Sequence, residues 1–347
     1  MEYELSDLML APAGLDRLRH GMGSKSLLRF GRRVAEVGAE VAAAALLDRL
    51  RPLRGGLRQV AEGRAPFGRG SLAIYLHWSP TGAVSEMVLR QLDAWTEAGF
   101  DLVFVSNATP PPEDWDKLAT RTVLLMTRDN VGRDFGGWRD ALPIALERFG
   151  TPRELLLAND SVLGPIRPLG PVLAALRGGG EGLFGLTESR GGGAHLQSYL
   201  LLARGAGAVQ EVAAHLAAFR LTRSKWRLVQ QGEIGLTRRM LEAGHRVAAL
   251  FGYDRITAGL TPGDLAALGP RFAEPDALSR YPLNPTHHLW RLLVERFGFP
   301  YLKTELLLRN PNGVPGIRDW PALVDPTMHA LIEAHLAQMQ AGIGGRD

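Results

Sequence analysis

The sequence contains no cysteine, which excludes disulfide bridges, thiolate metal sites and a cysteine nucleophile. It also lacks a strong excess of one charge: 40 Lys and Arg stand against 36 Asp and Glu, too balanced for a protein that coats nucleic acid. No stretch reaches the ~18 consecutive apolar residues that a transmembrane helix requires, and the first residues do not have the pattern of a secretory signal. We therefore expect a cytoplasmic protein with no nucleic-acid partner.

What is present is typical of a folded α/β chain. Hydrophobic residues make up 46% of the 347 residues, enough for a substantial core. The 41 glycines and 22 prolines cluster between apolar segments, where they indicate loops. This length fits two domains, or one large α/β domain with an appendage.

The basic residues are concentrated near the start of the chain. Residues 1–70 hold twelve Lys or Arg and eight Asp or Glu, so the whole net charge of +4 lies there. Residues 17–33 contain six basic residues and no acidic one. They suggest peripheral contact with an anionic membrane face, and the alternative is a solvated helix face. We expect an extension over 1–70, made of a helix at 26–50 and a linker at 55–70.

From residue 71 onward, short apolar runs alternate with segments of helical periodicity. This β-α alternation predicts a mostly parallel sheet flanked by helices, in a domain over 71–313 followed by a tail with a helix over 314–347. The expected strands are 71–77, 101–107, 121–126, 154–160, 182–189, 195–203 and 246–252. The expected helices are 84–98, 137–149, 205–220, 233–244 and 284–298.

Polar residues follow three successive strands of the predicted sheet. They are Ser106 with Asn107, then Asn130, then Asn159 with Asp160 and Ser161. Ligands of open parallel sheets bind outside the carboxyl ends of the strands. These three clusters therefore predict one binding site.

The glycine-rich turn over 130–138 has the features of a phosphate-binding turn. Its glycines permit a close backbone approach to a ligand, and the helix that follows offers free N–H groups. A tight β-α turn with an aspartate cap is the alternative interpretation. The residues that we expect to contact a nucleotide here are Asn130, Gly132, Arg133, Asp134, Gly136 and Trp138.

The segment 159–161 predicts a metal and diphosphate site. Asp160 is placed to bind Mg²⁺ or Mn²⁺ beside a diphosphate, because these ions take one or two carboxylates and leave other positions to phosphates. Asn159 and Ser161 flank it with oxygen donors. The alternative is a turn that ends a strand.

Two later segments carry candidates for the acceptor side. Glu233 opens a predicted helix and is either a general base or a residue that favours the helix dipole. Polar residues at two strand ends are candidates to line an acceptor site, or else form the polar tip of a hairpin: Thr187, Glu188, His195, Gln197 and Ser198. The adjacent His287 and His288 diverge on a helix, which favours packing over joint metal binding.

Taken together, these segments resemble the rhamnan synthesis protein F family of bacterial polysaccharide glycosyltransferases. The resemblance extends over about 71–313, and it rests on NVGRDFGGWRDAL (130–142), LLLANDSVLGPIRPL (155–169), GLFGLTES (182–189), HLQSYLLL (195–202), EIGL (233–236) and NPTHHLWRLLVERFGFPYLKTELLLRNP (284–311).

The resemblance implies a GT-A-like, Rossmann-like α/β fold with an N-terminal helical extension. It also implies that Asn130, Gly132 and Asp134 contact the nucleotide, and that Glu233 is the base of an inverting reaction. The segment 159–161 would stand in the D-x-D position, yet it has one carboxylate where that motif has two. Glu233 is followed by Ile234, where an aspartate is common.

We therefore expect a glycosyltransferase that moves a sugar, with rhamnose as a candidate, from a nucleoside-diphosphate donor to a growing cell-surface polysaccharide. The acceptor would be a glycan or a lipid-linked glycan, and Mn²⁺ or Mg²⁺ would assist. The alternative is a non-catalytic glycan-binding or assembly subunit on the same scaffold.

Overall fold

The computed structural model describes residues 3–10, 24–273 and 277–344. The strands of its main sheet are β1 (Ser6–Asp7), β2 (Leu57–Glu62), β3 (Ser71–His77), β4 (Asp101–Ser106), β5 (Leu124–Arg128), β6 (Glu154–Asn159), β8 (Gly182–Ser189), β9 (His195–Leu196), β10 (Leu200–Arg204) and β11 (Val247–Phe251). A separate two-stranded sheet pairs β7 (Val162–Leu163) with β12 (Leu302–Lys303).

The main sheet has the strand order β1-β11-β8-β10-β6-β3-β4-β5-β2, with β9 paired to β8 outside this path. Strands β3, β4, β5 and β6 form parallel pairs, and β8 pairs with β11 in parallel as well. Strand β10 runs antiparallel between β6 and β8, and β1 and β2 are antiparallel edge strands. The expected α/β architecture with a large, mostly parallel sheet flanked by helices is confirmed.

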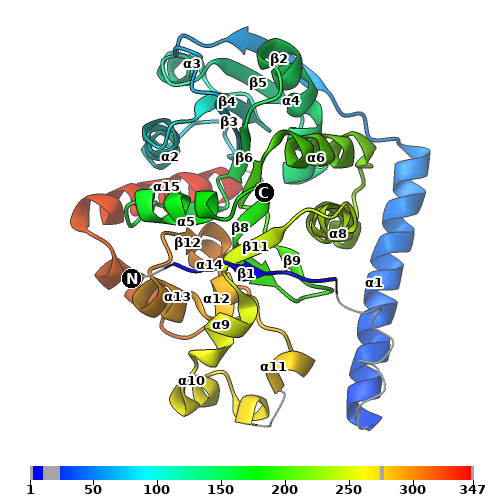
Figure 1. Cartoon of the computed structure of the whole chain (residues 1–347). Helices are drawn as coiled ribbons and strands as arrows, with labels where there is room; N and C mark the ends of the chain where they lie inside the picture. The colour runs from blue at the N-terminus through cyan, green and yellow to red at the C-terminus, as the bar shows by residue number, and fades with distance from the viewer. Residues whose placement is uncertain (1–2, 11–23, 274–276, 345–347) are drawn as a thin grey trace.

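Helices cover both faces of this sheet (Figure 1). One face packs against α2 (Glu86–Glu97), α3 (Pro112–Ala119), α5 (Gly170–Gly178), α13 (Trp290–Phe297) and α15 (Pro326–Gly344). The other face packs against α4 (Arg133–Phe149), α6 (Ala206–Ala218) and α8 (Gly235–Glu242). The remaining helices are α1 (Ser24–Leu50), α7 (Lys225–Val229), α9 (Tyr253–Ala258), α10 (Pro262–Ala267), α11 (Ala277–Arg280), α12 (Pro285–His288) and α14 (Thr304–Arg309), with a π-helical turn at Gln230–Ile234 and 3₁₀ turns at Pro270–Ala273 and Ile317–Leu323.

The core is divided into two clusters by the sheet. Tyr75 and Phe104 belong to the cluster under α2, whereas their neighbours Ile74 and Val105 belong to the cluster under α4. Successive side chains of a strand point to opposite faces, so strands buried on both faces are apolar at nearly every position. This explains why continuous apolar runs marked the central strands in the sequence.

Three segments differ from the expectation. Residues 57–62, expected in a linker, form the edge strand β2, which pairs with β5 and leaves most of its side chains exposed. The expected strand at 195–203 is divided into β9 and β10. The expected helix at 284–298 is interrupted at Leu289, between α12 and α13.

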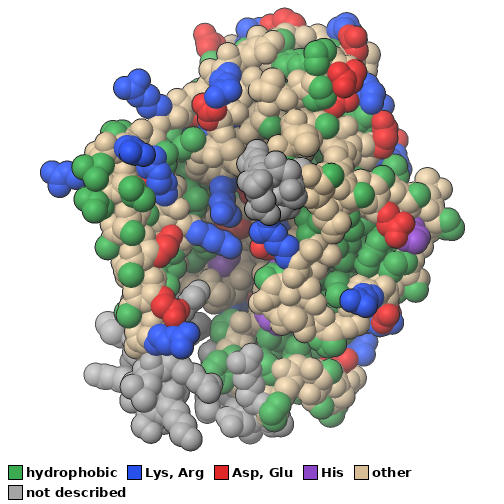
Figure 2. Space-filling model, turned by 180° about the vertical axis from the view of Figure 1, so that it is seen from behind, with side chains coloured by type: hydrophobic (Ala, Val, Ile, Leu, Met, Phe, Trp, Pro, Cys, Tyr) green, Lys and Arg blue, Asp and Glu red, His purple; other side chains and the backbone are tan. Residues whose placement is uncertain are grey.

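The predicted helix at 26–50 is confirmed as α1, which lies along one side of the molecule (Figure 1). Glu40 accepts hydrogen bonds from Ser224 Oγ at 3.0 Å and from the backbone N–H of Lys225 at 2.8 Å, which tie α1 to α7. The molecule is hollowed beside α1, and Lys and Arg side chains gather in the hollow (Figure 2).

Contact between residues 17–33 and a membrane stays a prediction, and 17–23 lie outside the described residues. Within the described ranges, no helix combines the length and the apolar character that crossing a bilayer requires.

Candidate active site

The site lies at the carboxyl ends of β3 and β6, where the winding of the sheet reverses. The chain winds from β3 outward through β4 and β5 on one side, and β6 begins the other side. Such a switch point leaves a crevice in which ligands of open α/β sheets bind. The two strand ends are joined here, because Asp160 Oδ2 accepts a hydrogen bond of 2.6 Å from the backbone N–H of Trp78.

The first turn of α4 forms one wall. Gly132 has φ +74°, and a Cβ added there would lie 2.5 Å from Leu221, so both backbone and space require glycine. Arg133 follows with φ +51°, an uncommon conformation for a residue with a side chain. Such backbone strain is concentrated at functional sites. The turn presents the N–H groups of a 17-residue helix to the crevice.

Asp134 connects this turn to the end of β6. Its Oδ2 accepts a hydrogen bond of 2.9 Å from Asn159 Nδ2, and Asn159 Oδ1 accepts from the backbone N–H of Ser161 at 3.0 Å. The structure therefore brings together two of the predicted clusters, the glycine-rich turn and the segment 159–161.

Glu233 lies in the π-helical turn that joins α7 to α8. Ser198 donates to Glu233 Oε1 twice, from its backbone N–H at 3.0 Å and from Oγ at 2.6 Å. His195 Nε2 lies 3.5 Å from Glu233 Oε2. His195 Nδ1 donates to the carbonyl of Gly193 at 2.8 Å, while Nε2 of the same ring faces Glu233. π-helical turns occur frequently at functional sites.

A pocket of about 150 Å³ opens between these elements. It is lined by Gly132, Arg133, Asp134, Phe135, Ser198, Lys225, Leu228, Val229 and Glu233. Five of the predicted site residues thus share one pocket, together with Lys225 and two apolar residues of α7. A basic side chain on each of two walls suits an anionic ligand.

The three carboxyl groups differ in their protonation. Burial raises the pKa of Asp134 to about 6, against the opposing charge of Lys303. Burial also raises the pKa of Asp160 to about 7, and the nearby charge of Asp134 adds to it. Burial would raise the pKa of Glu233 too, but hydrogen bonds with His195 and Ser198 outweigh it and hold the pKa below its ordinary value. Divergent pKa values of this kind distinguish the acid from the base in an active site.

Lys303 is a site residue that the sequence analysis missed. Its Nζ donates to Ser161 Oγ at 3.0 Å and lies 4.9 Å from the centroid of the Tyr199 ring. Burial lowers its pKa, while the charges of Glu233 and Asp134 oppose that shift. Lys303 comes from β12, far along the chain, so no local pattern could connect it to Ser161.

Five other predicted nucleotide contacts do not line this pocket. Ser106 is buried, with its Oγ 3.0 Å from His77 Nδ1, and Asn107 Oδ1 accepts from Arg128 Nη1. Trp138 is fully buried in the core under α4. Asn130 is exposed on the turn before α4, and the backbone of Gly136 packs against the carbonyl of Val131. Whether these residues contact a nucleotide stays a prediction.

The remaining acceptor-side candidates form a buried polar layer beside Glu233. Thr187 Oγ1 donates to Gln197 Oε1 at 2.6 Å, and Gln197 Nε2 donates to Asn284 Oδ1 at 3.4 Å. Glu188 Oε2 accepts from the backbone N–H of Tyr253 at 2.9 Å. Their role in acceptor binding stays a prediction.

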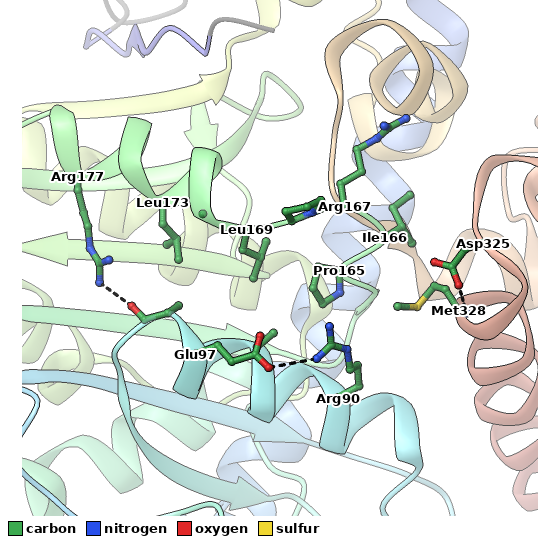
Figure 3. Close-up of a pocket in the computed structure, with 14 residues that line it drawn as sticks. Arg90, Glu97, Pro165, Ile166, Arg167, Leu169, Leu173, Arg177, Asp325 and Met328 are labelled. Atoms are coloured by element: carbon green, nitrogen blue, oxygen red, sulfur yellow. Dashed lines mark hydrogen bonds and ion pairs between the residues drawn. The ribbon is translucent and has the colours of Figure 1, made fainter.

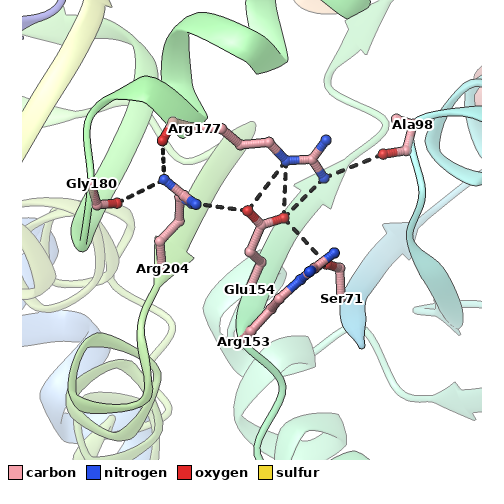
Figure 4. Close-up of polar contacts among 7 residues, drawn as sticks. All are labelled: Ser71, Ala98, Arg153, Glu154, Arg177, Gly180 and Arg204. Atoms are coloured by element: carbon pink, nitrogen blue, oxygen red, sulfur yellow. Dashed lines mark hydrogen bonds and ion pairs between the residues drawn. The ribbon is translucent and has the colours of Figure 1, made fainter. Parts of the chain in front are cut away.

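A larger cavity of about 600 Å³ lies between α2, α5 and the start of α15 (Figure 3). Its arginines are bound to protein groups: Arg90 pairs with Glu97 at 3.5 Å, and Arg167 donates to the carbonyl of Val294 at 3.2 Å. Glu154, at the amino end of β6, accepts hydrogen bonds from both Arg177 and Arg204 (Figure 4). These contacts favour a structural role, and we place the candidate active site at the strand ends.

Comparison with known proteins agrees with the predicted resemblance. Residues 102–267 match the family described as rhamnan synthesis protein F, so the resemblance expected from the sequence is confirmed. Asp134, Asn159, Asp160 and Glu233 lie within the matched segment, whereas Lys303 lies beyond it.

Two further proteins are similar over parts of the chain. An uncharacterized protein, y4gN, of Sinorhizobium fredii (strain NBRC 101917 / NGR234) is 36% identical over 108 residues, which are 31% of this chain and 28% of that protein. The chain thus spans less than a third of the length of this curated relative. A crystal structure described as a nucleotide-diphospho-sugar transferase, from Desulfovibrio desulfuricans G20, is 14% identical with a TM-score of 0.35, covering 53% of this chain and 80% of that one.

Proposed function

We propose, from the match of residues 102–267 to the rhamnan synthesis protein F family, that this chain is a GT-A-like glycosyltransferase. It moves a sugar from a nucleoside-diphosphate donor to a hydroxyl of a growing cell-surface polysaccharide, and rhamnose is the candidate sugar. One observation carries the proposal: a pocket at the switch point of the sheet places the ionised carboxylate of Glu233 opposite the first turn of α4.

Glu233 acts as the general base in this proposal. A carboxylate with a lowered pKa is ionised at neutral pH, so it is ready to take the proton of the acceptor hydroxyl. The freed oxygen attacks the anomeric carbon of the donor sugar from the side opposite the phosphate. The bond from that carbon to the phosphate oxygen breaks, the nucleoside diphosphate leaves with the electron pair, and the anomeric configuration inverts.

The first turn of α4 receives the leaving diphosphate. Backbone N–H groups at a helix N-terminus and the guanidinium of Arg133 stabilise negative charge that develops on phosphate oxygens. Because these groups are already in place before the reaction, they need no reorganisation as the charge forms.

Asp160 and Asp134 would hold a divalent cation if one takes part. The negative charge of Asp134 raises the pKa of Asp160, and a bound cation would relieve this repulsion. Among the described residues, no three His, Asp or Glu side chains come together as a metal group. Two carboxylates are still enough for Mg²⁺ or Mn²⁺ when donor phosphates supply other ligands. The cation would neutralise charge on the diphosphate.

Nucleotide titration tests the proposal. We expect one of UDP, GDP and dTDP to bind in isothermal titration calorimetry, more tightly with Mn²⁺ than without it, and we expect Asp160→Ala to remove the effect of Mn²⁺. Glu233→Gln should keep the affinity for that nucleotide and lower the rate of sugar transfer by about 10²- to 10⁴-fold, because it removes the base but not the donor site.

Three outcomes contradict parts of this proposal. If Glu233→Gln transfers sugar at the wild-type rate, Glu233 is not the general base. Nucleotide binding that does not respond to Mn²⁺ removes Asp160 as a metal ligand. If the wild-type protein binds none of the nucleotides but does bind a glycan, the alternative of a non-catalytic glycan-binding subunit is favoured.

A further inference from the structure

Lys303 is fixed to the end of β6 by its own backbone. In the two-stranded sheet, β12 pairs with β7 so that Lys303 stands opposite Val162. The next residue, Thr304, donates from its backbone N–H to the carbonyl of Ser161 and from Oγ1 to the carbonyl of Asp160, both at 3.0 Å. The lysine is therefore positioned by the same loop that carries Asp160.

The ammonium of Lys303 lies beside Ser161 and Tyr199. One hydrogen of its ammonium is directed to Ser161 Oγ at 3.0 Å, and the ring of Tyr199 supports the charge from 4.9 Å. An ammonium has three donors, so two remain for other acceptors. The carboxylates whose charges act on it include Glu233, Asp134 and Asp160.

The carboxyl groups near Lys303 already have other hydrogen-bond partners. Glu233 already accepts two hydrogen bonds from Ser198 and faces His195. Asp134 Oδ2 accepts a hydrogen bond from Asn159 Nδ2, and Asp160 Oδ2 accepts one from the backbone N–H of Trp78. The ammonium of Lys303 therefore has donors available for a phosphate group that enters the crevice.

We propose that Lys303 and Ser161 form the subsite for the sugar-bearing terminal phosphate of the donor, and that Lys303 makes the site prefer a nucleoside diphosphate over a monophosphate. This inference rests on the proposed function. The terminal phosphate gains negative charge when its bond to the anomeric carbon breaks. A fixed ammonium therefore stabilises the transition state more than the bound donor.

The test compares nucleoside diphosphate and monophosphate of the same base on Lys303→Met. Charge-assisted hydrogen bonds contribute about 1.5–3 kcal/mol, which corresponds to roughly 10- to 100-fold in affinity. We expect Lys303→Met to lose at least about 10-fold in diphosphate affinity and to keep its monophosphate affinity within about 2-fold, with EDTA present so that no metal contributes. If Lys303 had only a structural role, its replacement would lower the affinities for both nucleotides by a similar factor.

Lys117→Met is the matched control. Lys117, in α3, also lies between carboxylates, 3.5 Å from Glu86 and 3.6 Å from Asp114, but its side chain is exposed. The Lys117→Met variant should bind the diphosphate and the monophosphate with the affinities of the wild type. Should Lys303→Met fail to fold, Lys303→Arg keeps the charge and should keep the preference for the diphosphate, whereas Lys303→Gln should lose it.

The outcomes separate this inference from the proposed function. If Lys303→Met binds the diphosphate as tightly as the wild type, or loses both nucleotides equally, the subsite is wrong while nucleotide binding by the wild type still supports a transferase. If the wild-type protein binds neither nucleotide, the proposed function fails and the subsite fails with it.

Discussion

Two residues, His195 and Ser198, hold the pKa of Glu233 below its ordinary value. His195 faces Oε2, and Ser198 supplies two hydrogen bonds to Oε1, so the carboxylate stays ionised although burial opposes it. Asp134 and Asp160, a short distance away, have their pKa values raised by the same burial. The contacts of His195 and Ser198 thus distinguish a group that is ready to accept a proton from two groups that tend to retain one.

Ser198→Ala should shift the acidic limb of the pH profile to higher pH. The ionised form of Glu233 loses one donor, so its pKa rises, and kcat/KM begins to fall at a higher pH than in the wild type. On the acidic limb we expect a decrease in kcat/KM of roughly 2- to 10-fold, the contribution of one hydrogen bond, whereas kcat/KM at neutral pH should change little because Glu233 stays ionised there. The measurement is kcat/KM for sugar transfer from pH 4 to pH 8.

Ser71→Ala is the control for this profile. Ser71 Oγ donates to the buried Glu154 at 3.2 Å, a similar contact at the opposite end of the sheet (Figure 4). The acidic limb of Ser71→Ala should coincide with that of the wild type. If the acidic limb of Ser198→Ala also coincides with that of the wild type, Glu233 does not determine the pH profile.

At the site, local patterns could identify the residues that follow strand ends but not their partners. Asp134, Asn159 and Glu233 were predicted because each stands at the boundary of a recognisable strand or helix. Lys303 and Lys225 were missed, since their relevance depends on contacts between distant segments. The sequence around Lys303 does not distinguish it from an exposed lysine, because its contact with Ser161 depends on the fold.

Among the elements, the π-helical turn at Gln230–Ile234 determines where Glu233 points. Its Gly232 lies against Phe135, and a Cβ added there would approach the ring to 2.6 Å. Phe135 belongs to the first turn of α4, so this contact sets the distance between the proposed base and the proposed phosphate-binding turn. A side chain at position 232 would push the two walls of the pocket apart.

Gly232→Ala should therefore impair both turnover and stability. Overpacking costs about 1–3 kcal/mol, and the displaced Glu233 should lower kcat by at least about 10-fold. Enzyme assays and thermal melts on the same protein measure both effects. Gly38→Ala is the control, because nothing lies within 4 Å of its added Cβ in α1, and it should keep full activity with a slight gain in stability. Full activity in Gly232→Ala would contradict the role of this contact.

The sheet shows which elements a sequence can reveal. Strands β3 to β6 were visible because burial on both faces makes them continuously apolar. The edge strand β2 was missed, because an edge strand with exposed, polar side chains between glycines looks like a loop. Pairing with β5, which makes it a strand, is a long-range property.

At the scale of the whole molecule, the first 70 residues close both edges of the sheet. β1 covers the free edge of β11, and β2 covers that of β5. Leu8 is buried beside β1, and its backbone N–H donates to the carbonyl of Val247 at 2.8 Å. The N-terminal extension is thus part of the sheet itself.

Deletion of residues 1–10 should destabilise the protein and promote self-association. Loss of one buried leucine and its strand pairing corresponds to about 2–5 kcal/mol, and the uncovered edge of β11 offers unpaired N–H and C=O groups to another copy. Thermal melts and size-exclusion chromatography measure the two effects. Leu10→Ala, which truncates an exposed side chain of the same segment, should behave like the wild type. An unchanged melting temperature in the shortened chain would refute this role of β1.

The pairing of β1 with β11 also has a consequence for the order of folding. Ser6 and Ala249 face each other in the sheet although they are about 240 residues apart in the chain. During synthesis β1 leaves the ribosome long before β11 is made, so β1 stays unpaired while the central strands assemble. Contacts over such a separation form late, because the entropy of closing the loop must be overcome first. Strand β1, which is made before the central strands, is therefore among the last to join the sheet.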